Sequence, residues 1–361
     1  MPYGTLQADK IQGSINSFSP DSVIFRNRII NGNMAIAQRG TSAVTTDESF
    51  PVDRFQLQIV NANLSLIQSS DAPAGFNYSI AATVTSTTST NANDRSRLFQ
   101  NIEGFNVADL GWGTANAKTI TVSFWARSTV TGTYSGNITN NGGNRSYIFT
   151  YALTANTWTY VTATVPGDTS GTWGKTNGNG LGFNPITFNC GSSFQGTAGS
   201  WIAGDARGTS GSTYLATTNS GAVFNITGVQ LEVGSQATSF DYRPYGTELA
   251  LCQRYYAKVG PSTSGVYPGF GTAGGESSTA AFGIFTTPVT MRSTPTFSSS
   301  GTLTLYSNGF SNITSFGTAY YTTNTVAINI NVSGGGLTAG RFYNILANND
   351  TAAFVQFTSE L

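Results

Sequence analysis

The sequence predicts an all-β fold built from antiparallel sandwiches. Wherever a pattern is legible in the 361 residues, apolar and polar side chains alternate with a period of two, as in strands with one buried face. Clusters of Gly, Asn, Asp and Ser separate these segments and indicate turns. With 39% hydrophobic residues, the chain also has enough apolar side chains for a substantial core.

The clearest strand is predicted over residues 119–127. Because side chains alternate between the two faces of a strand, four apolar residues fall on one side and a mainly polar set falls on the other. The apolar set is Ile120, Val122, Phe124 and Ala126, and the opposite set is Thr121, Ser123, Trp125 and Arg127. The same pattern predicts strands over 147–153, 157–165, 223–233, 302–306 and 325–332.

One helix is predicted over residues 247–256, where Thr247 is in the position of a cap. Composition changes at this point, because all five tryptophans precede the helix and only six charged residues follow from Lys258 onward. The first two dozen residues carry too few apolar side chains for a core of their own. We therefore expect three parts: an N-terminal segment (1–25), a sandwich (26–245), and a part (246–361) that holds the helix and a distal β domain.

Composition excludes several chemistries. The chain has 17 basic and 17 acidic residues and no histidine, so it cannot form a Ser-His-Asp or Cys-His pair or a His-ligated zinc site. The balanced charge argues against nucleic acid as a partner. The N-terminus lacks the pattern of a signal peptide and no run of 18 apolar residues occurs, which predicts no membrane insertion. Cys190 and Cys252 are expected to be buried free thiols.

Two stretches carry a family resemblance. The first is residues 28–40 (RIINGNMAIAQRG) with 51–55 (PVDRF), and the second runs from 226–234 (ITGVQLEVG) through 240–245 (FDYRPY) to 248–256 (ELALCQRYY). They resemble the opening and the close of a domain found in tail-fibre and appendage proteins of tailed bacteriophages. That domain is similar to jelly-roll carbohydrate-binding modules. The resemblance implies a jelly-roll β-sandwich over residues 26–245, followed by a smaller C-terminal β-sandwich domain.

The resemblance also implies a function. Residues 3–11 (YGTLQADKI) look like the virion-attached N-termini of some phage fibres, with Tyr3, Leu6, Ile11 and Ile15 as the docking side chains. We expect a tail-fibre protein of the virion, assembled in the cytoplasm of the bacterial host, whose C-terminal β domain binds a glycan of the host envelope without cleaving it. A homotrimer is expected, because fibres of this kind are usually trimeric and strands so poor in charge risk edge-to-edge association.

Candidate sugar-binding residues are aromatic rings in turn-rich loops, since a flat ring can cover the apolar face of a sugar. They are Trp112, Trp173 and Trp201 in the first domain and Tyr267, Phe270, Tyr320, Tyr321 and Tyr343 in the distal one. The alternative for each ring is that it fills the end of a sandwich or packs against a neighbouring subunit. Trp125 and Trp158 fall within strands and are interpreted as core or sheet-face residues.

Two alternative functions stay open. One is a neck or collar appendage with a structural role, and the other is a polysaccharide depolymerase. The only carboxylates that suggest a glycosidase pair are Asp47, Glu48, Asp53, Glu103 and Asp109, for which solvation of loops is the simpler explanation. No catalytic residue, cofactor or metal is predicted. Related modules often hold a structural calcium with a carboxylate near the last strand, but the corresponding residues 226–229 (ITGV) have none, and the opening stretch offers Asn31 and Asn33 rather than acids. Because calcium favours anionic oxygen ligands, we expect no calcium at that position.

Overall fold

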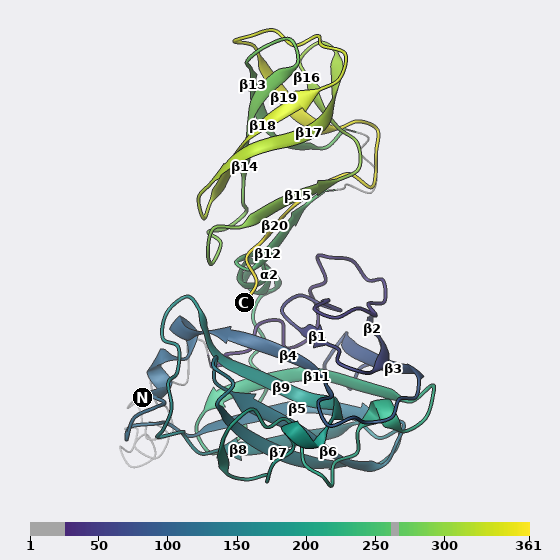
Figure 1. Cartoon of the computed structure of the whole chain (residues 1–361), viewed down its shortest axis with the longest axis vertical. Helices are drawn as coiled ribbons and strands as arrows, with labels where there is room; N and C mark the ends of the chain where they lie inside the picture. The colour runs from purple at the N-terminus through teal and green to yellow at the C-terminus, as the bar shows by residue number, and fades with distance from the viewer. Residues whose placement is uncertain (1–25, 261–266) are drawn as a thin grey trace, which may run out of the picture. The chain divides into compact units, whose positions relative to one another are not determined.

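A computed structural model describes residues 26–260 and 267–361, and these divide into two compact units (Figure 1). Unit 1 comprises 26–35, Ala43–Ser49 and Leu57–Tyr242, and unit 2 comprises Ile36–Ser42, Phe50–Gln56 and Arg243–Leu361. Two short segments that the sequence analysis assigned to the 26–245 domain thus belong to unit 2. The proposed attachment residues Tyr3, Leu6, Ile11 and Ile15 lie outside the described residues.

Unit 1 is a two-sheet antiparallel sandwich, and the chain crosses repeatedly from one sheet to the other (Figure 1). The six-stranded sheet has the order β1 (Gln56–Gln58), β4 (Arg95–Glu103), β9 (Asn179–Cys190), β6 (Gly132–Thr139), β7 (Arg145–Leu153) and β10 (Trp201–Ala203). The five-stranded sheet has the order β2 (Asn63–Ser69), β3 (Ser79–Ser86), β11 (Val223–Val233), β5 (Ile120–Ser128) and β8 (Thr159–Val165). Single 3₁₀ turns are η2 (Gly104–Asn106), η3 (Ala108–Leu110), η4 (Ser192–Phe194) and η5 (Leu215–Thr217).

The core of unit 1 is formed by the inward faces of the two sheets. Ile120, Val122, Phe124 and Ala126 of β5 are all fully buried, as the alternation predicts. Phe124 meets Tyr151 of the opposite sheet edge-on, with ring centroids 5.3 Å apart. Burying one such side chain contributes about 1.5–3 kcal/mol. The predicted all-β fold, with a jelly-roll sandwich as its larger part, is confirmed.

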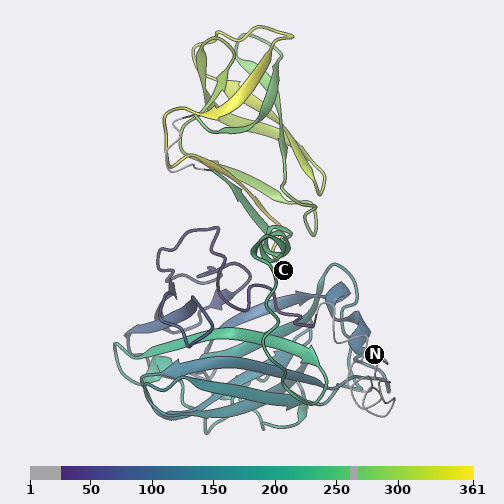
Figure 2. The same ribbon diagram turned by 180° about the vertical axis from the view of Figure 1, so that it is seen from behind.

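Unit 2 combines a helix, a small sheet and a closed barrel (Figure 2). The helix is α2 (Tyr245–Gln253), and the small sheet has the order β12 (Tyr256–Val259), β20 (Phe354–Thr358) and β15 (Thr296–Ser300). The barrel has the order β13 (Gly269–Gly275), β14 (Ala280–Thr286), β18 (Thr325–Val332), β17 (Phe310–Tyr321), β16 (Leu303–Tyr306) and β19 (Phe342–Ala347). None of the helices in the described residues is long and apolar enough to cross a membrane.

The barrel differs from the second sandwich that the sequence predicts. Alternation with a period of two is the same in a sandwich and in a barrel, so it cannot distinguish them. Closure is helped by glycines where strands approach closely. A Cβ on Gly271 would lie 2.5 Å from the Ile284 carbonyl oxygen, and one on Gly283 would lie 2.5 Å from the Ile330 side chain. A larger residue at Gly271 would have to displace the β14 backbone, and one at Gly283 would have to displace the Ile330 side chain.

The predicted helix also differs at both ends. It begins at Tyr245 with Pro244 as the cap residue, so Thr247 lies inside the first turn. Tyr256, which the sequence placed on the helix, begins strand β12. Cys190 and Cys252 are free and buried, as predicted. Burial raises the pKa of the Cys190 thiol to about 11, which keeps it protonated and unreactive near neutral pH.

A buried polar cluster joins the separate segments of unit 2. Arg54 and Arg39 both pair with Glu360, the latter at 3.0 Å between Nη2 and Oε1. Each guanidinium also lies 3.6 Å from a ring centre, Arg54 over Tyr255 and Arg39 over Tyr256. These charge-assisted contacts connect Glu360 to two arginines that lie more than 300 positions earlier in the sequence.

Asp53 is the buried acid of this polar cluster. Its side chain is 1% exposed and accepts a 3.0 Å hydrogen bond from the Gln38 backbone nitrogen. Burial raises the pKa of the Asp53 carboxyl to about 6, against the lowering effects of Gln38 and Arg39. The folded state therefore binds this proton more tightly than the unfolded chain does.

The variant Asp53→Asn tests this linkage. A folded pKa above the unfolded one gives stability that is fully present below about pH 4 and is lost as the pH rises through about 6. Relative to Asp53→Asn, the wild-type chain should lose roughly 3 kcal/mol of unfolding free energy across that interval. Calorimetric unfolding from pH 4 to pH 7 measures the difference. Asp109→Asn, at an exposed position, is the control, and a flat difference for Asp53→Asn would contradict the assignment.

Candidate functional site

The structure brings the three loop tryptophans of unit 1 together. Trp112, Trp173 and Trp201 meet edge-on, with ring centroids 4.6–5.5 Å apart. Each indole N–H donates to a backbone carbonyl, for example Trp112 to Lys118 at 2.7 Å. Trp112 and Trp173 are 3% and 8% exposed, so in this structure each packs against its neighbours and neither has an open face. Trp201 is half-buried against both.

The candidate rings of unit 2 do not form one site. Tyr343 is 5% exposed, its hydroxyl accepts a hydrogen bond from the Thr338 backbone, and its ring belongs to the barrel core. Phe270 is half-buried against the barrel core. Tyr320 and Tyr321 are exposed neighbours at the end of β17. Tyr267 is exposed and stacks on Phe310, with ring centroids 5.1 Å apart.

An aromatic groove on the outer face of the five-stranded sheet was missed by the sequence analysis. Trp125 of β5 and Tyr160 of β8 stand directly opposite each other in register, with ring centroids 5.3 Å apart. Trp125 is half-buried and Tyr160 is 42% exposed. These two rings form one side of a groove of about 430 Å³.

The wall of the groove is the segment 234–242, which follows β11 and folds back over the outer face of its own sheet. Glu232 anchors it by accepting hydrogen bonds from the Thr238 backbone (2.9 Å), the Thr238 hydroxyl (2.7 Å) and the Gln230 amide (2.8 Å). The Gln230 side-chain oxygen in turn accepts from the Asp241 backbone at 2.8 Å. Glu232 and Gln230 are buried, so these bonds compensate for their loss of water.

The returning segment completes the groove with a second group of rings. Phe76, Phe240 and Tyr242 contact one another with centroids 4.8–5.6 Å apart, and the Tyr242 hydroxyl donates to the Gly75 carbonyl at 2.6 Å. Phe76 lies on Gly228, which has a φ of +64° in a bulge of β11. A Cβ at Gly228 would lie 2.6 Å from the Phe76 ring.

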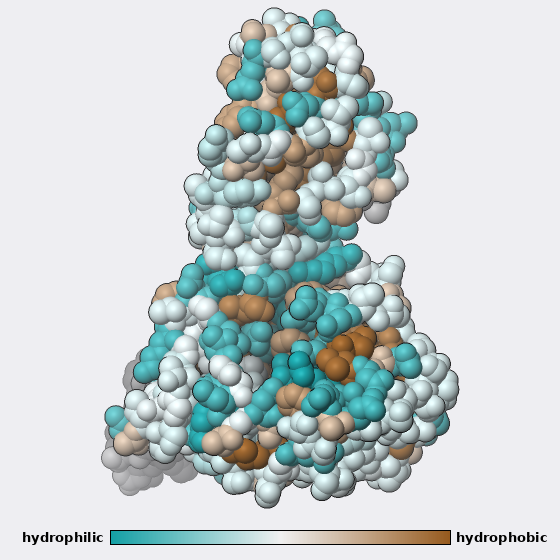
Figure 3. Space-filling model, viewed as in Figure 1, coloured by the Kyte–Doolittle hydropathy of each residue, from teal (hydrophilic) through white to brown (hydrophobic). Residues whose placement is uncertain are grey.

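The chemistry of the groove is apolar and hydroxyl-rich. Its lining consists of the five rings of Phe76, Trp125, Tyr160, Phe240 and Tyr242, together with Ser123, Thr238, Ser239, Gly228 and Ala237. None of these lining residues carries a charge. On the face of the molecule in Figure 3, pale residues of intermediate hydropathy lie among teal hydrophilic and brown hydrophobic ones.

A signal for this groove is present in the sequence. Because Phe124 and Ala126 face the core, Trp125 between them must face outward, and a tryptophan on the polar face of a strand is a candidate contact residue. Tyr160 is likewise a large aromatic residue on the outward face of its own strand. The wall could not have been predicted by such reasoning, since it depends on how residues 234–242 turn back.

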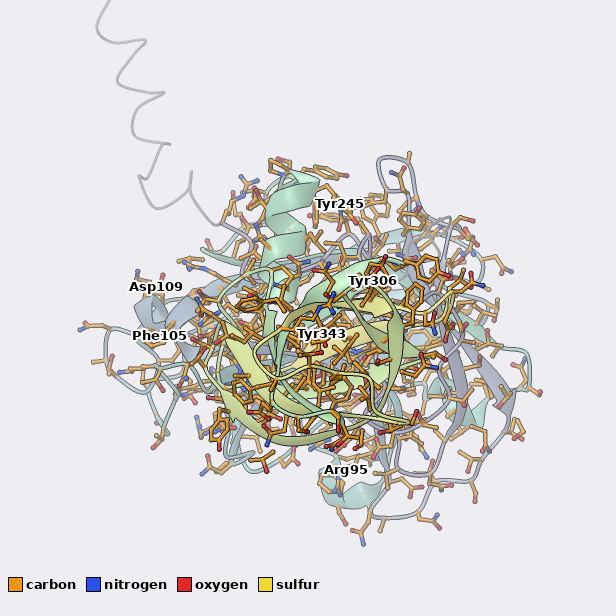
Figure 4. The ribbon with its side chains drawn as sticks, turned by 90° about the horizontal axis from the view of Figure 1, so that it is seen from above. Arg95, Phe105, Asp109, Tyr245, Tyr306 and Tyr343 are labelled. Carbon is orange, nitrogen blue, oxygen red and sulfur yellow. The ribbon has the colours of Figure 1, made fainter. Side chains whose placement is uncertain are left out.

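The carboxylates considered for a glycosidase pair are engaged separately. Asp109, in η3, pairs with Arg28 at 2.8 Å, and Asp47 accepts from the Ile59 backbone at 2.7 Å. Figure 4 shows Asp109 near Phe105, which belongs to the preceding turn η2. Glu103 is buried at the end of β4, and Asp53 belongs to the polar cluster of unit 2.

Comparison with protein-family models and with curated proteins finds no match. Among solved structures, the chain is similar to the enzymatically active domain of tailspike protein 4 from bacteriophage CBA120, at 13% identity and a TM-score of 0.32, over 58% of this chain and 21% of that one. It is similar to a putative sugar-binding protein from Bacteroides thetaiotaomicron, at 14% identity and 0.32, over 58% and 100%. A third is TmCBM61 in complex with β-1,4-galactotriose, at 9% and 0.30, over 58% and 99%. All three likenesses are distant.

Gly228 can be tested as the support of Phe76. Gly228→Ala forces a left-handed backbone on a residue with a Cβ, which costs about 1–2 kcal/mol, and it also displaces the ring. Gly221→Ala is the matched control, because its φ is +82° but no atom lies within 4 Å of the new Cβ. Chemical unfolding followed by tryptophan fluorescence should show a clearly larger loss for Gly228→Ala. Equal losses would mean that Phe76 does not depend on this contact.

Proposed function

We propose that the chain binds a saccharide, without cleaving it, in the aromatic groove of unit 1. The observation that carries the proposal is the lining: five aromatic rings with hydroxyl side chains between them and no charged group. A sugar presents apolar C–H faces that pack on such rings, and hydroxyls that serine and threonine can hydrogen-bond. The groove volume of about 430 Å³ is within the range of about 300–1,000 Å³ typical of ligand sites.

The groove is also preorganised. Tyr242 is fixed by its bond to Gly75, and the Tyr160 hydroxyl lies 3.4 Å from the Thr238 carbonyl of the wall. At the end of the Trp125 strand, Arg127 pairs with Asp71 and lies over the Trp158 ring at 5.1 Å. Rings held in this way lose little conformational freedom on binding, which favours affinity.

A further part of the proposal concerns the source of the glycan and the particle to which the chain belongs. We propose that the glycan belongs to a bacterial envelope and that the chain is a tail-fibre protein of a phage virion, a homotrimer that other virion proteins hold through residues 1–25. The support is the resemblance of residues 28–40, 51–55 and 226–256 to tail-fibre and appendage proteins. A neck or collar appendage is the alternative. The separate engagement of Asp47, Asp53, Glu103 and Asp109 gives no support to a depolymerase.

Trp125→Ala and Tyr160→Ala test the groove. Each removes one ring and should weaken binding of a neutral oligosaccharide about fivefold or more, because an aromatic contact is worth roughly 1 kcal/mol or more. Ligands would be selected on an array of neutral oligosaccharides, and their affinities then measured by titration calorimetry. Trp201→Ala is the matched control, since it removes a half-buried tryptophan of the same unit that does not line the groove. Loss of binding only in the control, or no binding to the array, would refute the proposal.

The homotrimer is tested by sedimentation. The purified chain should sediment as a species of three chains at micromolar concentration, because closed association covers strand edges and apolar faces that a charge-poor surface does not protect. A stable monomer under these conditions would contradict this part of the proposal and leave the sugar groove unaffected.

A further inference from the structure

Unit 2 carries a second groove, on the outer face of barrel strands β16, β19 and β13. It has a volume of about 550 Å³ and is lined by Thr272, Tyr306, Ser307, Asn308, Phe342, Tyr343 and Asn344. A smaller groove of about 250 Å³ shares Ser307, Asn308 and Tyr343 with it and adds Arg341. Figure 4 shows Tyr306 and Tyr343 on the barrel. No residue of these two grooves lines the groove of unit 1.

Two outward rings dominate the larger groove. Phe342 is 82% exposed, and its cross-strand partner Gly274 has no side chain and no atom within 4 Å of the position of a Cβ. Tyr306 pairs with Asn344, two residues along β19 from Phe342, which makes the two rings diagonal neighbours. Such neighbours lie about 7–8 Å apart. The open space beside Phe342 leaves the ring accessible to a ligand.

Tyr306 is flanked by another exposed ring. Its ring centroid lies 4.8 Å from that of Phe310, and Phe310 in turn stacks on Tyr267. Phe310 therefore contacts both tyrosines, and Tyr267, a candidate from the sequence, packs beside the groove without lining it.

Arg341 supplies a fixed positive charge at the junction of the two grooves. Its Nε donates to the Ser307 hydroxyl and its Nη2 to the Ser307 carbonyl, both at 2.8 Å. A guanidinium has five N–H donors, so other donors are left for a ligand. Within the described residues, Arg341 has no acidic partner within ion-pair distance, and neither groove is lined by an Asp or Glu.

We infer that this surface of the barrel is a second binding site, for a saccharide that carries a carboxylate. An acidic sugar combines in one residue what the site offers: a flat apolar face for Phe342 or Tyr306 and an anion for the planar fork of Arg341. Asn308, Asn344 and Thr272 supply donors and acceptors for the sugar hydroxyls. A neutral sugar leaves the guanidinium unused, and a simple anion leaves the rings unused.

The test is titration calorimetry of the full chain with trigalacturonate, N-acetylneuraminic acid and a hyaluronan tetrasaccharide, with galactotriose as the neutral comparison. At least one acidic saccharide should bind at least tenfold more tightly than galactotriose, and its affinity should fall with salt. Arg341→Gln and Phe342→Ala should each weaken that binding about tenfold or more. Tyr320→Ala, which removes an exposed ring of the same barrel outside both grooves, should leave it unchanged.

Tryptophan fluorescence separates this inference from the proposed function. No tryptophan lines either barrel groove, so an acidic saccharide bound there should leave the tryptophan fluorescence unchanged, whereas a ligand on Trp125 should change it. Acidic binding that is lost in Trp125→Ala and kept in Arg341→Gln would overturn the inference and support the groove of unit 1. Failure of all three acidic saccharides to bind, or equally tight binding of poly-glutamate, would overturn the inference and leave the proposed function standing.

Discussion

The two-residue period of the antiparallel strand is the constraint on which both units depend. In β5 it sends Phe124 and Ala126 into the core, and by the same geometry it sends Trp125 outward. In β19 it buries Tyr343 and Ile345 and exposes Phe342 and Asn344. Core and binding surface are therefore two faces of the same strands, and a ring on the outer face is positioned by the packing of its inward neighbours.

Much of the fold follows from this period, and so it could be predicted. The segments around Ile120, Val223 and Thr325 are strands within one or two residues of their expected ends. The closure of the barrel could not be predicted, because it depends on how closely strands approach at positions such as Gly271. The sequence also could not show that Ile36–Ser42 and Phe50–Gln56 pack with residues near the C-terminus. Contacts of such long sequence separation leave no local pattern.

The candidate sites, like the fold, could be predicted from the sequence only in part. A ring in a Gly-rich loop was a reasonable candidate, yet Trp112 and Trp173 bury each other because large rings lower the free energy more by packing together than by facing water. The groove of unit 1 instead combines a strand pair with a returning segment that buried polar groups hold in place. Glu232 can be buried there because Thr238 and Gln230 donate hydrogen bonds to its oxygens and the Arg26 Nε lies 3.9 Å from Oε2.

The path of the chain between the two units has a consequence for modular exchange. The chain enters unit 2 at Ile36, returns to unit 1 at Ala43, and repeats this at Phe50 and Leu57 before the final passage at Arg243. A fragment cut at residue 246 would lack Arg39, Asp53 and Arg54, and Glu360 would lose both of its ion-pair partners. Recombination at a single crossover near that position would therefore transfer an incomplete unit. A functional chimera needs the two short inserts to travel with the C-terminal part.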